Sequence, residues 1–245
     1  MNDIVLSLEK VHLKFKLHKQ RSKSLKDTFS TFLSRKKIKN SKEQFHALNN
    51  INFNLKKGER LGIVGANGSG KSSLLKIICK IYEPSSGSVK SNLKITPLLE
   101  AGAGFQPEFT GRENIYLNGA INGMSRNEIE ENINEIISFS EVGDFIDIPV
   151  KNYSTGMYMK LAFSISTALN PELLIIDELF VGGDFKFLKK GKDRIHKLIN
   201  KSKSMILVSH DHETLRTLCN KFIWIENGII KKIGNEEVLD FYLLS

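Results

Sequence analysis

Cysteine is scarce in this sequence, and a long apolar run is missing altogether. Only two cysteines, Cys79 and Cys219, occur among the 245 residues. Two cysteines argue against a disulfide framework, and since both stand among apolar residues we expect buried thiols. No apolar stretch approaches the roughly 18–20 residues that cross a bilayer, and the first residues lack the basic region and apolar core of a secretory signal. We therefore expect a soluble, cytosolic chain.

Acidic residues are too few to balance the basic ones, and the formal net charge is +9. Between His18 and Gln44 nine lysines and arginines stand against two acidic residues, so most of the excess lies in a basic insertion, residues 18–44. We take the remainder as nearly neutral, which argues against a nucleic-acid-binding surface. The apolar residues of the insertion are spaced as in an amphipathic helix. Two interpretations stay open: a solvated surface insertion, or a helix near anionic headgroups or a membrane partner.

A phosphate-binding loop is the strongest motif present. Residues 65–72 fit the pattern G-x-x-x-x-G-K-[ST], and they follow a short apolar run, Leu61–Val64, and precede a helical apolar stripe. In such a loop, backbone N–H groups and the helix N-terminus converge on the phosphates of a nucleotide. Lys71 is placed to reach the β- and γ-phosphates, and the Ser72 hydroxyl is the expected Mg²⁺ ligand. The predicted nucleotide-binding residues here are Gly65, Ala66, Asn67, Gly68, Ser69, Gly70, Lys71, Ser72 and Ser73.

Two further buried strands carry polar residues at their carboxyl ends. The run Leu173–Ile176 is followed by Asp177 and Glu178, and the run Met205–Val208 is followed by Ser209 and His210. Parallel strands of an open α/β sheet present their carboxyl ends at the ligand-binding edge. We therefore predict that Asp177 holds Mg²⁺, that Glu178 orients or deprotonates the attacking water, and that His210 reaches the same rim.

The remaining pattern predicts an α/β fold with an inserted helical block. Short alternating or apolar runs predict strands at residues 4–8, 11–15, 47–55, 89–99 and 222–225. From Thr110 to about Asp147 the apolar residues recur near a period of 3.6, which is typical of helices. Asn227-Gly228 predicts a hairpin turn.

A second candidate anion-binding site precedes another helix. Tyr153, Ser154, Thr155, Gly156 and Met157 place small hydroxyl and glycine residues at a predicted helix N-terminus. The phosphate loop already serves the nucleotide on one side. We therefore expect the second helix N-terminus to face the nucleotide bound by another copy of the same chain.

The order of phosphate loop, signature, carboxylate strand and histidine resembles the ATP-binding subunits of ABC transporters, over nearly the whole chain. The resemblance is closest to the subgroup that exports O-antigen, capsular polysaccharide or teichoic acid. It rests on an atypical signature, Tyr153–Met157, and on three stretches elsewhere: Leu98–Phe105, Thr110–Asn114 and Val181–Asp184. The resemblance implies one ATPase domain over residues 1–245, a P-loop core with antiparallel β elements and a helical subdomain at about 110–168.

What the resemblance implies for function is a homodimer that closes on two ATP molecules. Ser154 and Gly156 would contact the γ-phosphate bound by the other subunit, Asp184 would lie in the loop linking the two sites, and His210 would sense the γ-phosphate. An integral-membrane permease subunit would contact the glycan, and this chain would sit peripherally on the cytoplasmic face of the membrane without binding nucleic acid. Because the sequence ends at Ser245, we expect no added sugar-binding domain.

Two positions implied by the resemblance have competing candidates. Phe15 fits best as the aromatic that stacks on adenine, and Phe45 is the alternative. Relatives have a Gln that couples Mg²⁺ to the membrane partner; here the spacing indicates Glu100, with Gln106 as the alternative. A rival to export is a nucleotide-switched ATPase acting in regulation or translation. A nucleotide kinase would leave the signature unexplained.

Overall fold

The computed structural model describes residues 3–16, 44–99, 102–178 and 184–245. Within these residues the strands form two sheets. Residues 18–43 of the basic insertion and Glu100 are not among the described residues. An antiparallel sheet has the order β2-β1-β4. Its strands are β1 Ile4–Lys16, β2 Gln44–Lys56 and β4 Ser86–Ser91. The expected strands at 4–8 and 11–15 are one strand, which continues through an irregularity at Lys10, where φ is 49°.

The second sheet is parallel apart from one edge strand, with the order β5-β6-β7-β3-β8-β9. Its strands are β3 Arg60–Val64, β5 Ile95–Leu98, β6 Leu173–Asp177, β7 Ser204–Val208, β8 Lys221–Glu226 and β9 Ile229–Gly234. The turn predicted at Asn227-Gly228 joins β8 to antiparallel β9. A single strand over 89–99 was wrong: Ser91 Oγ accepts a bond from Leu93 N, and this turn separates β4 from β5 in the other sheet.

The parallel sheet is buried on both faces, which explains the apolar runs of its strands. Along β6, Leu173 and Ile175 join the core between the two sheets, whereas Leu174 and Ile176 join the core on the opposite face. Helix α2, Lys71–Ile78, packs in the first core. The second core is covered by α6 Phe185–Lys201, α7 His212–Leu218 and α8 Glu236–Leu243. Strands covered on both faces read as continuous apolar segments, as the sequence predicted.

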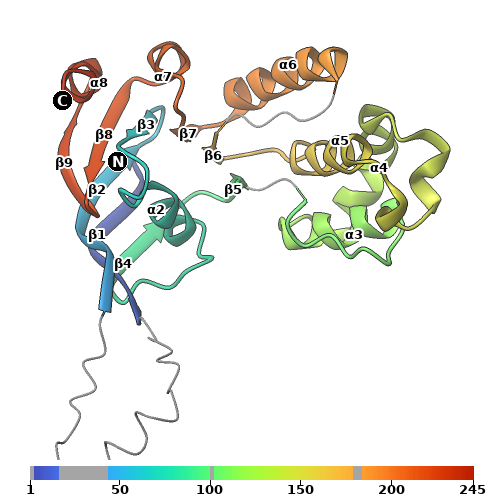
Figure 1. Cartoon of the computed structure of the whole chain (residues 1–245), viewed down its shortest axis with the longest axis horizontal. Coiled ribbons are helices and arrows are strands. Elements are labelled where there is room, and N and C mark those ends of the chain that lie inside the picture. The colour runs from blue at the N-terminus through green and yellow to red at the C-terminus, as the bar shows by residue number, and fades with distance from the viewer. Residues whose placement is uncertain (1–2, 17–43, 100–101, 179–183) are drawn as a thin grey trace, which may run out of the picture.

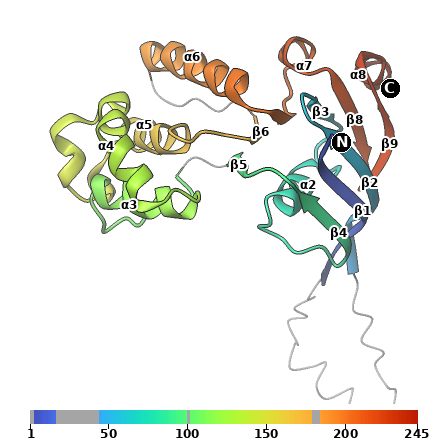
Figure 2. The same ribbon diagram turned by 180° about the vertical axis from the view of Figure 1, so that it is seen from behind.

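Three helices stand to one side of the sheets as a helical lobe with an apolar core of its own (Figures 1 and 2). They are α3 Gly111–Ile121, α4 Arg126–Ser140 and α5 Thr155–Ser166. Two short 3₁₀ turns, Gly143–Asp147 and Val150–Asn152, connect α4 to α5. Reciprocal capping boxes, Thr110 with Glu113 and Ser125 with Glu128, start α3 and α4.

Outside the basic insertion, basic residues are concentrated on one helix. Helix α6 carries seven lysines and arginines and one aspartate, Asp193, within 17 residues. The residues outside the basic insertion are nonetheless close to neutral in sum, because acidic residues elsewhere offset this basic helix. Among the described residues no helix is long and apolar enough to cross a membrane.

Both thiols lie in the apolar interior, as expected, although neither residue is fully enclosed. Burial raises the pKa of the Cys79 thiol and that of the Cys219 thiol to about 12.

Candidate nucleotide site

The phosphate loop joins β3 to α2, and its backbone requires glycine. Gly65 has a φ of 152°, and a Cβ on it would lie 2.2 Å from the Ile225 carbonyl oxygen. Gly70, the N-cap of α2, has a φ of 111°, and its Cβ would lie 2.9 Å from the Ala47 carbonyl oxygen. No side chain caps this helix end. Its first N–H groups are therefore left for an external acceptor, as an anion-binding loop needs.

Lys71 lies inside this loop and is only 8% exposed. Its Nζ donates to the carbonyl oxygens of Gly65 at 2.7 Å and Ala66 at 3.0 Å. Burial lowers the pKa of Lys71, while the charges of Asp177 and Glu178 act in the opposite direction. Nearby, the Ser69 Oγ is buried without a hydrogen-bond partner among the described residues. A buried ammonium and an unpaired hydroxyl around a ring of N–H groups suit a bound phosphate chain.

The carboxyl end of β6 brings a carboxylate to the same loop. Asp177 shares a hydrogen bond with the Ser72 side chain, and burial raises the pKa of Asp177 despite that bond. Two hard oxygen donors thus stand side by side. Among the described residues, no cluster of three or more His, Cys, Asp or Glu side chains could hold a metal. A two-donor set fits Mg²⁺, which takes few protein ligands and completes its shell with phosphate oxygens and water.

Glu178 and His210 meet across the ends of β6 and β7. Glu178 Oε1 lies 3.5 Å from His210 Nε2, and both side chains are half exposed. The backbone of Glu178 is left-handed, with a φ of 58°, and its N–H donates to the Val208 carbonyl oxygen at 2.9 Å. This conformation is disfavoured for residues with a Cβ. Its occurrence at Glu178, whose side chain faces His210, indicates a functional position.

The strand ends enclose one hollow of about 650 Å³. Lys71, Asp177, Glu178 and His210 all line it, together with residues of the phosphate loop. Leu99, Met159 and Val208 also line it, and sequence reasoning gave none of these three a role at the site.

The two aromatic candidates are paired neighbours on β1 and β2 but face different surroundings. Phe45, which is 52% exposed, lines the hollow. Phe15 is not among the lining residues, and its ring packs edge-on against Tyr82 at 5.8 Å between centroids. The geometry therefore favours the alternative, Phe45, as the aromatic next to the nucleotide.

The signature residues are not part of this hollow. Ser154 caps α5, and its Oγ accepts from Met157 N at 3.2 Å. The Tyr153 hydroxyl donates to the Phe145 carbonyl oxygen at 2.7 Å, and burial raises the pKa of Tyr153 to about 12. Ser154 and Thr155 are exposed, and of α5 only Met159 reaches the hollow. One chain alone does not bring the signature to its own phosphate loop.

The residues predicted to couple the site to its partners are Glu100, Gln106 and Asp184, and the two that the structure describes do not line the hollow. Glu100 lies outside the described residues. Gln106 is exposed, its N–H donates to Asn114 Oδ1 at 2.8 Å, and it does not line the hollow. Asp184 caps α6 by accepting from Phe187 N and pairs with Lys160 Nζ at 2.6 Å. Lys160 was not singled out from the sequence, because its partners come from distant segments.

Comparisons with known proteins agree on one family. The ABC transporter family model matches residues 48–181. An O-antigen export system ATP-binding protein, RfbB of Myxococcus xanthus, is 41% identical over 235 residues, which cover 93% of this chain and 54% of that protein. A teichoic acids export ATP-binding protein, TagH of Staphylococcus haemolyticus, is 35% identical over 240 residues, 98% of this chain and 88% of that protein. The chain thus spans about half of the first relative and most of the second.

Solved structures show the same fold. A dimeric post-hydrolysis state of an ATP-binding cassette bound to ADP and phosphate has a TM-score of 0.67 at 22% identity. The match covers 94% of this chain and 98% of that one. The α/β architecture predicted from the sequence, with its antiparallel sheet and helical block, is therefore confirmed as that of an ATP-binding cassette.

Proposed function

The chain belongs to the ABC transporter family, and we propose that it is the ATP-hydrolysing subunit of a polysaccharide or teichoic acid exporter, working as a homodimer with a separate membrane permease. One observation carries the proposal: three strand ends gather Lys71, Asp177, Glu178 and His210 around one hollow, while the signature, in which Ser154 and Thr155 are exposed, lies outside it. A second copy, placed head to tail, would lend its signature to this hollow.

Each side chain then has a role in phosphoryl transfer. The phosphates of ATP replace the carbonyl oxygens that Lys71 Nζ now contacts, and Lys71 neutralises developing charge. Glu178 orients the attacking water and accepts its proton. His210, within 3.5 Å of Glu178, holds that carboxylate in place and contacts the γ-phosphate.

Ser72 and Asp177 would hold Mg²⁺, which supplies charge neutralisation at the phosphates. Because burial raises the pKa of Asp177, a proton competes with the metal for this carboxylate. Magnesium binding by these residues should therefore weaken as the pH falls.

Ser154 and Gly156 would meet the γ-phosphate held by the other subunit, at the N-terminus of α5. Asp184 would lie at the junction between the two sites. Glu100 or Gln106 remains the candidate for coupling to the permease.

The glycan itself would be contacted mainly by the permease. The two relatives are export ATP-binding proteins. They support export over the regulatory alternative.

The proposed function is tested by phosphate release from MgATP together with a partner assay. We expect the purified chain, reconstituted with the permease of its own organism, to hydrolyse ATP and to move lipid-linked glycan across a vesicle membrane. A chain that binds ATP but co-purifies with no membrane protein, and whose loss leaves glycan export intact, would contradict the proposal.

The adenine contact gives a separate prediction. Phe45→Ala should weaken ATP binding by about fivefold to 150-fold, since stacking of a base on an aromatic ring is worth about 1–3 kcal/mol. Phe15→Ala, on the paired strand, should change ATP affinity less than twofold, because Phe15 does not line the hollow. Equilibrium titration with a fluorescent ATP analogue measures both. A larger loss from Phe15→Ala than from Phe45→Ala would reverse the assignment.

A further inference from the structure

Helix α4 ends in an unusual way. Its C-cap residue, Glu141, has φ 58° and ψ 22°, the left-handed conformation that glycine normally supplies at a helix end. A glycine, Gly143, stands only two positions further on. A carboxylate is thus kept where the backbone would prefer no side chain. Such local conflicts are expected where the side chain has a function.

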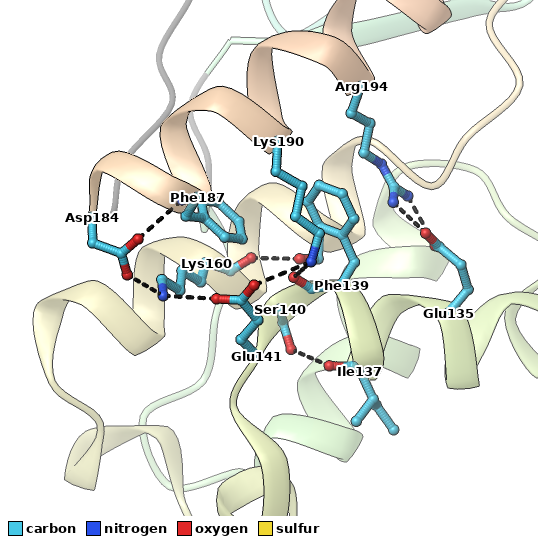
Figure 3. A network of polar contacts seen from close by, with 11 residues as sticks. Glu135, Ile137, Phe139, Ser140, Glu141, Lys160, Asp184, Phe187, Lys190 and Arg194 are labelled. Atoms are coloured by element: carbon cyan, nitrogen blue, oxygen red, sulfur yellow. Dashed lines mark hydrogen bonds and ion pairs between the residues drawn. The ribbon is translucent and has the colours of Figure 1, made fainter.

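The Glu141 carboxylate joins three helices (Figure 3). Its Oε2 accepts from Lys160 Nζ on α5 at 3.1 Å, and its Oε1 accepts from Lys190 Nζ on α6 at 3.3 Å. Lys160 Nζ also donates to Asp184 Oδ2 at 2.6 Å. The result is a continuous chain of ion pairs, Asp184–Lys160–Glu141–Lys190, that links the helical lobe to the start of α6.

The centre of the network is partly withdrawn from water, whereas the Asp184 side chain at its end is 60% exposed. The Lys160 side chain is 15% exposed, and its Nζ lies 5.2 Å from the centre of the Phe187 ring. Lys190 Nζ lies 4.3 Å from the centre of the Phe139 ring and also donates to the Phe139 carbonyl oxygen. Ion pairs in such surroundings are screened less than surface pairs. The network can therefore hold α4, α5 and α6 in a defined relative position.

Two members of the network, Lys160 and Asp184, belong to segments that matter in the proposed dimer. Lys160 lies on α5, whose N-terminus is the signature. Asp184 caps α6 through Phe187 N, and its pKa is lowered to about 2, chiefly by the hydrogen bond from Lys160. We propose that Glu141 is a positioning residue for ATP hydrolysis: by bonding Lys160 and Lys190 together, it fixes the signature helix relative to Asp184, so that both meet the partner subunit in register.

This inference rests on the proposed function, and it predicts a split between binding and turnover. None of Glu141, Lys160, Asp184 and Lys190 lines the ATP hollow of its own chain. Loss of Glu141 should therefore leave the KM for ATP within about twofold and lower kcat by about tenfold, which lies within the range by which contacts distant from the ligands change coupling.

Two substitutions separate positioning from stability. Glu141→Ala and Glu141→Gly both remove the carboxylate, but only glycine relieves the left-handed backbone. The Gly variant should melt about 2–4 °C above the Ala variant. Both should nevertheless show the same tenfold fall in kcat. If Glu141 served stability alone, the Gly variant would recover wild-type kcat.

A matched control lies on the same pair of helices. Glu135, on α4, pairs with Arg194, on α6, with Nη2 and Oε2 2.9 Å apart, and this pair touches neither Lys160 nor Asp184 (Figure 3). Glu135→Gln should keep wild-type kcat, whereas Lys190→Met should reproduce the loss seen in Glu141→Ala.

The experiment measures steady-state ATPase kinetics and melting temperatures of the full chain, with its permease where turnover requires it. Wild-type kcat in both Glu141 variants, a kcat that follows the melting temperature, or an equal loss in Glu135→Gln would each overturn the inference. An inactive wild type would instead count against the proposed function, so the two failures are distinguishable.

Discussion

Replacing Glu178 by Gln is expected to lower ATP turnover by about 10³-fold or more, because a positioned group at a phosphoryl-transfer site commonly contributes that much. ATP affinity should stay within about threefold, since the amide keeps the shape of the side chain and removes a negative charge near the phosphates. Folding should be unaffected, because the Glu178 side chain is half exposed and Gln suits its backbone as well as Glu does. Phosphate release and ATP binding are measured on the same preparation.

A Glu-to-Gln change away from the hollow controls for the loss of one negative charge. Glu83 is exposed and does not line the hollow. Glu83→Gln should turn over ATP at the wild-type rate. Undiminished turnover in Glu178→Gln would remove Glu178 from its assigned role.

The second large effect concerns the signature. Gly156→Asp should lower turnover by about 10²–10³-fold, because its carboxylate would face the γ-phosphate held by the partner subunit. Within one chain the change is tolerated: apart from its chain neighbours and its own helix backbone, the nearest heavy atom to a Cβ at Gly156 is Ser154 Oγ, at 3.9 Å. An acidic residue in the first turn of α5 also suits the helix dipole. The variant should therefore fold normally and bind ATP as a monomer.

A control adds the same charge elsewhere in the helical lobe. Asn134 is exposed on α4, and Asn134→Asp should keep wild-type turnover. Loss of monomeric ATP binding in Gly156→Asp, rather than of turnover alone, would place the signature in the site of its own chain and contradict the proposed dimer.

The parts of the site that sequence could predict are those in which one strand or loop sets the geometry. Gly65–Ser72 needs only a strand, positive-φ glycines and a helix, all of which are local. Asp177 and His210 follow apolar runs whose burial on both faces is visible in composition. Because parallel strands end at one edge, the meeting of Lys71, Asp177 and His210 could be inferred without coordinates.

The parts that escaped prediction depend on pairing between distant segments. Phe15 and Phe45 stand opposite each other on β1 and β2, and only their packing shows that Phe45 lines the hollow. The strand expected at 89–99 is divided between two sheets, since β4 pairs with β1 and β5 pairs with β6. Glu141 shows no motif, because its partners lie 19 and 49 positions away.

The central claim is that two copies clasp ATP between the phosphate loop of one and the signature of the other. Sedimentation velocity of the Glu178→Gln protein with saturating MgATP tests it most directly, in the presence of the permease if the isolated chain requires it. We predict a shift from monomer to dimer that is reversed by removing ATP and absent when Gly156→Asp is added. Sedimentation as a monomer at saturating ATP, or dimerisation that Gly156→Asp leaves unchanged, would contradict it.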